Sequence, residues 1–379
     1  MTLSIDPKTL AAVHAALKSI PDRRNVIPVA GMFHLEPAGG GLVITATDCD
    51  IEAALTVDCA AEFDAVCLPP FLVEAAAGLG CAEVKIALDE RQAVVTGGKA
   101  RFAAPILPGS DFPKFRPSFE ASFEIAGNAL AKLIEATVDA ASGQGDDHRY
   151  YLEGVFLQVL AGRLHAVATN GHRLHTASVE MTSGTLSGGG GIIIPTKAAN
   201  EIARIGGKAG GQPITVETSK GAIAVHTEGE RLTSKLIDGT YPDWQRVVPQ
   251  ATEITATFDL AEIVAALDRV MKIQAVNEAE MKAKNKAGAI RLAEDGEFLT
   301  ISAGRSGDDA TATDAVRAEF SGAWGTRGVS AKYLRATLAA MKERGGDTVT
   351  IDTADAGSPM RIDSPTDEDF LAVVMPMRI

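Results

Sequence analysis

Three histidines stand close together near the middle of the sequence, at positions 165, 172 and 175. Imidazole side chains at such spacing can bind a metal ion or act as general acids and bases. However, no acidic or cysteine partner stands beside them at metal-ligand spacing, and no G-x-S-x-G nucleophile motif occurs in the chain. The residues therefore predict neither a metal site nor a catalytic site. An enzyme that uses these histidines with nearby acids is kept as the alternative from another functional class.

The four cysteines, at positions 49, 59, 67 and 81, all fall in the first third of the chain. None forms a C-x-x-C pair, which is the usual source of two zinc ligands, and a disulfide framework would be expected to extend over a whole small secreted protein. We therefore expect free thiols and no cofactor.

Composition narrows the class of protein further. The 379 residues are 46% hydrophobic and 22% charged, with a net charge of −13. This length predicts two or three globular domains. No apolar run reaches the roughly 18 residues of a membrane span, and the polar N-terminus does not resemble a signal peptide. The expected location is the cytoplasm.

The sequence contains one pattern three times: an apolar strand, a short glycine turn, an alternating strand and a small residue. Ala46, Ala168 and Ala303 stand at matching positions of the three copies. Internal similarity at a fixed period indicates a repeated structural module. We divide the chain into three domains at residues 1–118, 119–250 and 251–379.

Each copy also carries two helical patterns, and alternating strands follow the second helix in each copy. The expected helices are 7–19, 70–79, 129–141, 196–205, 260–273 and 332–341. The expected later strands are 83–88, 93–96, 214–217, 222–227, 348–352 and 360–362. The predicted fold is therefore α+β, with two helices on an antiparallel sheet in each of three repeated domains. The charged stretch 277–286 is expected to be an exposed loop or a helical insertion.

Charge is divided unevenly between the helices and the rest of the chain. Counted with their flanking residues, as 7–19, 70–80, 128–142, 196–206, 259–273 and 330–344, the six helical stretches together hold eleven Lys and Arg against eight Asp and Glu, although the whole chain is strongly acidic. A helix surface tolerates Lys and Arg in any protein, so these residues could simply face solvent and bind nothing. The alternative is that the helices face a polyanion; they include Lys197, Lys332 and Arg335.

Three segments carry a resemblance to a known family. Residues 167–174 (VATNGHRL), 241–247 (YPDWQRV) and 373–379 (VVMPMRI) resemble signature segments of the bacterial sliding clamp, the DNA polymerase III β subunit. Asn170 stands where that family usually has Asp, Phe71 where a basic residue is common, and Asp146 near a position that is commonly polar and uncharged. The resemblance extends in order over nearly the whole chain.

This resemblance implies a non-catalytic processivity subunit. Members of the family form head-to-tail homodimeric rings of six similar domains, with helices lining the hole. The ring encircles duplex DNA without reading its sequence and tethers the polymerase, so the partners would be DNA, a second copy, the polymerase α subunit, the clamp loader δ subunit and other proteins with a clamp-binding motif. A clamp-like paralogue that serves repair or a mobile element is the alternative within this class.

The resemblance also assigns residues, position by position. The DNA-contacting positions of the family correspond to Arg24, Tyr150 and Tyr151. The family's peptide-binding cleft corresponds to Leu152, Thr169, Gly171, His172, Arg173, Leu174, Pro242, Arg246, Val247, Val373, Met375, Pro376, Met377 and Arg378. Methionine side chains adapt to varied apolar guests, which suits a cleft that binds several partners.

Overall fold

The computed structural model describes residues 2–22, 26–89, 91–143, 145, 148–181, 183–283, 289–304 and 310–379, with the backbone alone over 274–283. Its α-helices are α1 (Pro7–Leu17), α2 (Pro70–Ala77), α3 (Gly127–Val138), α4 (Thr196–Ala209), α5 (Leu260–Ala283) and α6 (Ala331–Glu343). All six expected helices are confirmed. None of these helices is both long and apolar enough to cross a membrane.

Local sequence explains where the helices begin and which face they bury. Proline occupies the first turn of α1 and of α2, where its missing N–H costs no hydrogen bond. Ser330 caps α6 by accepting the Tyr333 N–H. Each helix then buries one stripe of apolar residues, such as Leu334, Leu338 and Met341 in α6.

The strands are antiparallel throughout. In the first third they are β1 (Thr2–Ile5), β2 (Phe33–Ala38), β3 (Gly41–Thr47), β4 (Ile51–Val57), β5 (Val66–Leu68), β6 (Val84–Leu88), β7 (Gln92–Gly97), β8 (Ala100–Pro105) and β9 (Leu107–Pro108). In the middle third they are β10 (Ala121–Ala126), β11 (Gly154–Leu160), β12 (Arg163–Thr169), β13 (Arg173–Glu180), β14 (Ile192–Pro195), β15 (Pro213–Thr218), β16 (Ala222–Thr227) and β17 (Glu230–Lys235). In the last third they are β18 (Thr255–Asp259), β19 (Ile290–Asp295), β20 (Phe298–Ala303), β21 (Ala312–Ser321), β22 (Thr326–Val329), β23 (Thr348–Asp352), β24 (Met360–Ser364) and β25 (Asp367–Val374).

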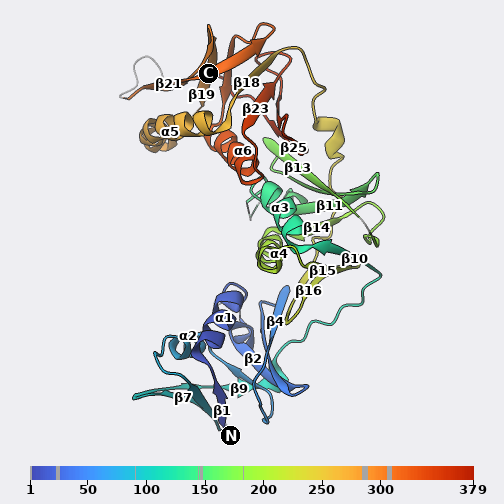
Figure 1. The fold of residues 1–379 in the computed structure, drawn as a ribbon, viewed down its shortest axis with the longest axis vertical. Coiled ribbons are helices and arrows are strands. Elements are labelled where there is room, and N and C mark those ends of the chain that lie inside the picture. The colour runs from blue at the N-terminus through green and yellow to red at the C-terminus, as the bar shows by residue number, and fades with distance from the viewer. Residues whose placement is uncertain are drawn as a thin grey trace. The chain divides into compact units, whose positions relative to one another are not determined.

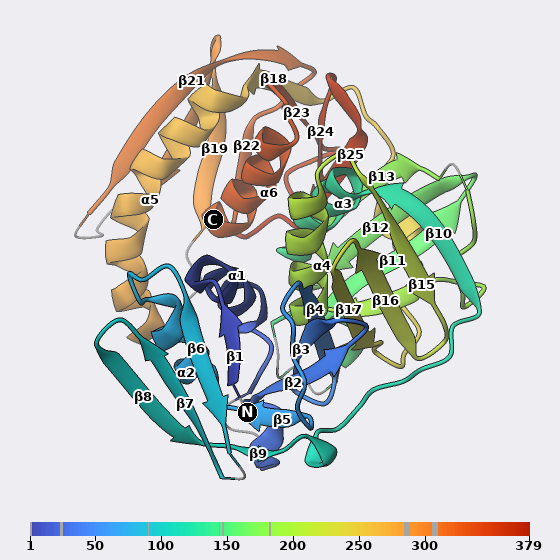
Figure 2. The ribbon, with the colours of Figure 1, turned by 60° about the horizontal axis from the view of Figure 1, so that its bottom comes forward.

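The chain forms two compact units, and the middle repeat is shared between them. The first unit comprises Met1–Gly127, Ser183–Gly188 and Lys208–Leu236. It contains a four-stranded sheet, β1-β6-β7-β8, and a nine-stranded sheet, β10-β15-β16-β17-β4-β3-β2-β5-β9. Helices α1 and α2 pack against each other, α1 over β3 and β4 and α2 over β7 and β8. Figure 2 shows β6, β7 and β8 side by side, with β8 at the edge.

The second unit comprises Asn128–Thr182, Gly189–Gly207 and Ile237–Ile379. Its sheet has twelve strands in the order β14-β11-β12-β13-β25-β24-β23-β18-β21-β20-β19-β22. Helices α5 and α6 lie side by side, α5 against β18, β20 and β21 and α6 against β25 (Figure 1). Helix α5 continues to Ala283, so the helical alternative for the charged stretch is confirmed up to that residue; 284–286 lie outside the described residues.

Strands of neighbouring repeats pair with each other, which the sequence pattern did not predict. Strand β4 of the first repeat pairs with β17 of the second, with Ala53 opposite Leu232. In the same way β13 of the second repeat pairs with β25 of the third, with His175 opposite Ala372. Sheets therefore run across the repeat boundaries.

Candidate functional site

An apolar pocket lies in the second unit, where β13 and β25 meet the segment after β17. Its volume is about 310 Å³. The residues that line it are Leu152, Thr169, Gly171, His172, Arg173, Leu174, Tyr241, Pro242, Asp243, Trp244, Val247, Val373 and Met375. A concave site of this size, lined mainly by apolar and aromatic side chains, is typical of a small-ligand or peptide-anchor site.

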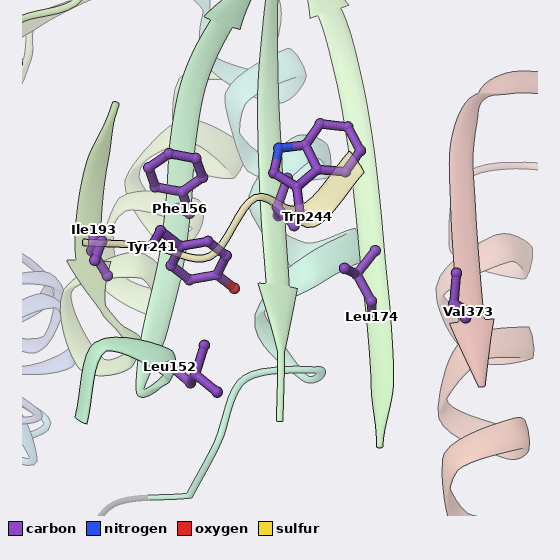
Figure 3. Close-up of a cluster of buried hydrophobic side chains, with 8 residues drawn as sticks. Leu152, Phe156, Leu174, Ile193, Tyr241, Trp244 and Val373 are labelled. Carbon is purple, nitrogen blue, oxygen red and sulfur yellow. The ribbon is translucent and has the colours of Figure 1, made fainter. Parts of the chain in front are cut away.

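Aromatic packing forms one wall of the pocket. The Tyr241 ring stacks on Phe156 with ring centres 4.6 Å apart, and the Trp244 indole donates to the Gln158 side chain over 3.3 Å. Figure 3 shows Tyr241 above Leu152 and Trp244 above Leu174. Trp244 begins a short 3-10 helix, Trp244–Val247, which places Val247 at the rim with 58% of its surface exposed.

A tight turn between β12 and β13 forms the opposite wall. The Thr169 hydroxyl donates to the Arg173 carbonyl oxygen over 2.6 Å. The Asn170 side-chain oxygen accepts the backbone N–H groups of His172 and Arg173 at 2.9 and 3.1 Å. An aspartate carboxylate would accept the same two bonds. The replacement of the family's usual Asp by Asn170 therefore leaves this turn intact.

Alternate residues of β13 connect the pocket to two helices. The buried Arg173 side chain ion-pairs with Asp139 at 3.3 Å, and its guanidinium lies 4.9 Å from the centre of the Tyr333 ring of α6. His175 is fully buried, with Nδ1 3.0 Å from the Ala136 carbonyl oxygen of α3 and Nε2 2.8 Å from the Thr337 hydroxyl of α6. Burial, followed by the positive charge of Arg173, lowers the pKa of His175 to about 4. His175 is thus a neutral core residue that joins α3 to α6.

The structure does not bring the three histidines together as a site. His165 packs 5.9 Å from the Trp244 ring, and His172 lies in the turn, 6.4 Å from Tyr333. Among the described residues, no group of three His, Cys, Asp or Glu side chains is arranged to hold a metal ion. All four cysteines are free thiols.

Most of the residues assigned to the cleft by resemblance line this pocket. They are Leu152, Thr169, Gly171, His172, Arg173, Leu174, Pro242, Val247, Val373 and Met375. Arg246, Pro376, Met377 and Arg378 are not part of the lining. Tyr241, Asp243 and Trp244 also line the pocket, although we did not assign them from the sequence. They lie within the 241–247 segment that carries the resemblance. That segment is the sequence signal that could have identified them.

The corresponding place in the first repeat has a different chemistry. There Phe112 stacks on His34 at 4.6 Å, as Tyr241 stacks on Phe156. However, Glu52 stands where the second repeat has Leu174. This buried carboxylate binds the Arg116 guanidinium at 2.8 Å and accepts the Phe115 N–H at 3.0 Å. A charged pair thus replaces the apolar surface found beside β13.

The residues proposed for polyanion contact differ in solvent exposure and in whether a carboxylate already binds them. Tyr150 is 49% exposed and Lys332 is exposed on α6, whereas Tyr151 and Lys197 are half-buried. The Arg335 guanidinium makes two hydrogen bonds to the Asp268 carboxylate, at 2.6 and 3.1 Å. Phe71 is 56% exposed at the start of α2. Arg24 and Asp146 lie outside the described residues.

Comparison with known proteins places the chain in a family. The models of the N-terminal, central and C-terminal domains of the DNA polymerase III beta subunit match residues 1–116, 124–243 and 245–378. The chain belongs to the DNA polymerase III β subunit family. Family membership confirms the predicted function of a sliding clamp, a non-catalytic processivity subunit of DNA polymerase III, and the predicted α+β fold of three repeated domains.

Curated relatives and solved structures of the β subunit family match this chain over all or nearly all of its length. The chain is 29% identical to the beta sliding clamp of Caulobacter vibrioides over 100% of both chains, and 29% identical to that of Escherichia coli over 94% of both. The crystal structure of the DNA polymerase III subunit beta from Pseudomonas aeruginosa matches with a TM-score of 0.87, 27% identity and full coverage of both chains. A sliding clamp from Bartonella birtlesii bound to griselimycin matches with a TM-score of 0.88, 25% identity and full coverage of both chains.

Proposed function

We propose that two copies of this protein associate head to tail into a ring that encircles duplex DNA in the cytoplasm. In this proposal the pocket beside β13 tethers the polymerase α subunit, the clamp loader δ subunit and other proteins that carry a clamp-binding motif. The observation that carries the proposal is the strand pairing that joins one repeat to the next.

This pairing between repeats occurs twice within the chain. The equivalent strand edges of the third and first repeats, in β21 and β8, have no such partner among the described strands. In both junctions the fourth strand of a repeat (β4 or β13) pairs with the third strand after the second helix of the next repeat (β17 or β25). The edge of residues 312–317 in β21 away from β20, and the edge of β8 away from β7, pair with no other described strand. Unpaired strand edges are templates for pairing with another chain. A third junction, between β21 and β8 of the partner subunit, uses both.

The repeat also predicts the register of this third junction. Across the strands, Phe123, Val216, Val225 and Leu232 lie opposite one another in turn, as do Ala256, Ile351, Ile362 and Ala372. The equivalent series in the first repeat is Leu3, Ile86, Val95 and Phe102.

Each series starts four residues before a helix, and Leu232 and Ala372 are the residues that pair with the preceding repeat. Their partners, Ala53 and His175, correspond to Ala312, because each pairs with the matched alanine of its own repeat. Phe102 should therefore lie opposite Ala312 of the partner subunit. A head-to-tail contact of this kind forms a closed ring when its rotation closes.

DNA contact in this ring is expected from the helix lysines. Four arginines in the helices or directly after them are ion-paired, namely Arg204, Arg269, Arg335 and Arg344. By contrast, six lysines in the helices or directly after them make no ion pair within the part of the chain that the structure describes: Lys8, Lys18, Lys132, Lys272, Lys332 and Lys342. All six are exposed. Exposed ammonium groups attract phosphates without reading base sequence, which permits sliding.

The pocket has the chemistry expected of a binding site for a short apolar motif. Leu174, Val373 and Trp244 give it an apolar interior, and Met375 and Val247 form an exposed rim. Buried aromatic and aliphatic anchors that fill such pockets carry most of the affinity in peptide recognition. The proposed cleft residues Arg246, Pro376, Met377 and Arg378 would contact the flanks of the motif.

A charged substitution at the rim tests the pocket assignment. Val247→Asp places a carboxylate where an apolar anchor would desolvate it, so a fluorescein-labelled peptide with adjacent leucine and phenylalanine residues should bind at least about tenfold more weakly by fluorescence anisotropy. The matched control is Val26→Asp, at a residue that is 95% exposed and outside the pocket lining. Equal affinity of both variants, or no binding to the unaltered protein, would refute the assignment.

A further inference from the structure

The last residues of the chain are held at two points after β25 ends. The Met375 N–H donates to the His172 carbonyl oxygen over 2.8 Å, in the turn that lines the pocket. The Met377 N–H donates to the Gly328 carbonyl oxygen over 2.8 Å, in β22. Pro376, between them, has a fixed φ and no N–H to donate. We call residues 375–379 the tail; it connects the pocket to β22.

Gly328 leaves no room for any larger residue beneath this tail. A Cβ atom built at Gly328 would lie 2.2 Å from the Met377 carbonyl oxygen and 2.4 Å from the Ile379 Cγ2 atom. Both distances are far shorter than a real Cβ contact, and the first is to backbone, which cannot rotate aside. Gly328 is buried and its φ is not in the left-handed region, so the need for glycine arises from the close approach of the tail.

Met375 connects this contact to the pocket. Its side chain lines the pocket and is 41% exposed, so packing around it does not fix its position from all sides. The backbone on both sides does so, through His172 and, two residues later, through Gly328. The stiff Pro376 transmits a displacement of Met377 to Met375.

We infer that Gly328 is a positioning residue for peptide binding: by admitting the tail against β22, it holds Met375 in the wall of the pocket. This inference rests on the proposed function of the pocket. It assigns a role to a residue that does not line the pocket, and it makes the affinity for an apolar peptide depend on the contact between the tail and β22.

A double-mutant cycle tests the inference on the full-length protein with the labelled leucine–phenylalanine peptide. The variants are Gly328→Ala, deletion of residues 376–379, and both changes together. Gly207→Ala is the control, because a Cβ there has no atom within 4 Å and the residue lies in α4. In the shortened chain the alanine meets neither Met377 nor Ile379, so the combined variant carries no clash that could unfold it.

We expect Gly328→Ala to raise the Kd of the peptide about tenfold and the deletion to raise it at least as much, because each releases Met375 from its position in the wall of the pocket. The combined variant should bind like the deletion alone, within about twofold, since Gly328 acts only through the tail. Gly207→Ala should leave the Kd unchanged. In Gly328→Ala the Met375 amide should also exchange its hydrogen faster, while the dimer mass and Tm stay close to those of the unaltered protein.

Two results would overturn the inference alone: unaltered peptide affinity in Gly328→Ala, or losses in the two single variants that multiply in the combined variant. Failure of the peptide to bind the unaltered protein would instead overturn the pocket assignment, and this inference with it. The two failures are therefore distinguishable in one titration series.

Discussion

Phe102 is the exposed aromatic residue that the proposed ring must cover. It lies in β8, at the edge of the four-stranded sheet, and 36% of its surface is exposed. The predicted register places it against Ala312 of the partner subunit. Phe102→Ala removes the phenyl group and leaves the buried core of the monomer unchanged. Its main effect should therefore be on dimerisation.

The magnitude follows from the area that the dimer would bury. An aromatic side chain offers about 200 Å², so the exposed part of Phe102 is about 70 Å². At about 25 cal/mol per Å², burial contributes about 1.8 kcal/mol at each junction. A head-to-tail dimer contains two identical junctions, so the substitution should cost about 3.6 kcal/mol. This corresponds to a rise of about 400-fold in the dimer Kd.

Sedimentation equilibrium over a range of concentrations measures this Kd, with the 39.5 kDa monomer as the product of dissociation. Tyr150→Ala is the matched control, since Tyr150 is 49% exposed and lies in the 3-10 helix Tyr150–Leu152, outside both strands of the proposed junction. It should leave the Kd unchanged. A Phe102→Ala protein that dimerises as tightly as the control would refute the predicted junction.

Two further predictions concern charge. Lys332→Ala should weaken association with duplex DNA several-fold at low salt and less at high salt, as measured by fluorescence anisotropy. The double variant Asp268→Ala/Arg335→Ala removes one negative and one positive charge, so it should bind DNA like the unaltered protein. Equal salt-dependent losses of affinity in both variants would contradict the division between free lysines and paired arginines. Burial lowers the pKa of His175 to about 4 from 6.5, so between these pH values the unfolded chain binds a proton that the folded chain excludes. The free energy of unfolding should therefore fall by up to about 3 kcal/mol as the pH falls from about 6.5 to about 4. His175→Gln, which can hydrogen-bond but does not titrate in this range, should show a smaller fall in urea titrations at pH 7 and pH 4.5, and an identical fall would exclude His175 as its source.

The sequence predicted the local structure well where one signal dominated. Proline and aspartate before the apolar stripe at Leu10, Val13 and Leu17 marked the start of α1, and strict alternation of apolar and polar residues marked β23 at both bounds. These signals involve residues close together in the chain, so one sequence is sufficient to read them.

Contacts between distant residues were not predictable in this way. Nothing in the sequence near Arg335 shows that Asp268 neutralises it, because the two meet only when α5 packs on α6. The pairing of Ala53 with Leu232 likewise depends on how two repeats meet. For the pocket, the resemblance supplied residues such as Leu174 and Val373. Tyr241 and Trp244 became evident only from the stacking and burial of their rings.

The most direct test of the ring closes it covalently around DNA. Phe102→Cys and Ala312→Cys, in a protein whose Cys49 and Cys81 are replaced by serine, would place two thiols opposite each other at both junctions, within reach of a disulfide after small backbone adjustment. The protein is assembled on a nicked circular plasmid, oxidised and washed with detergent. We expect it to remain with the circular DNA and to be released when the plasmid is cut once. Loss from the circular DNA despite complete cross-linking, or retention after the cut, would contradict the account.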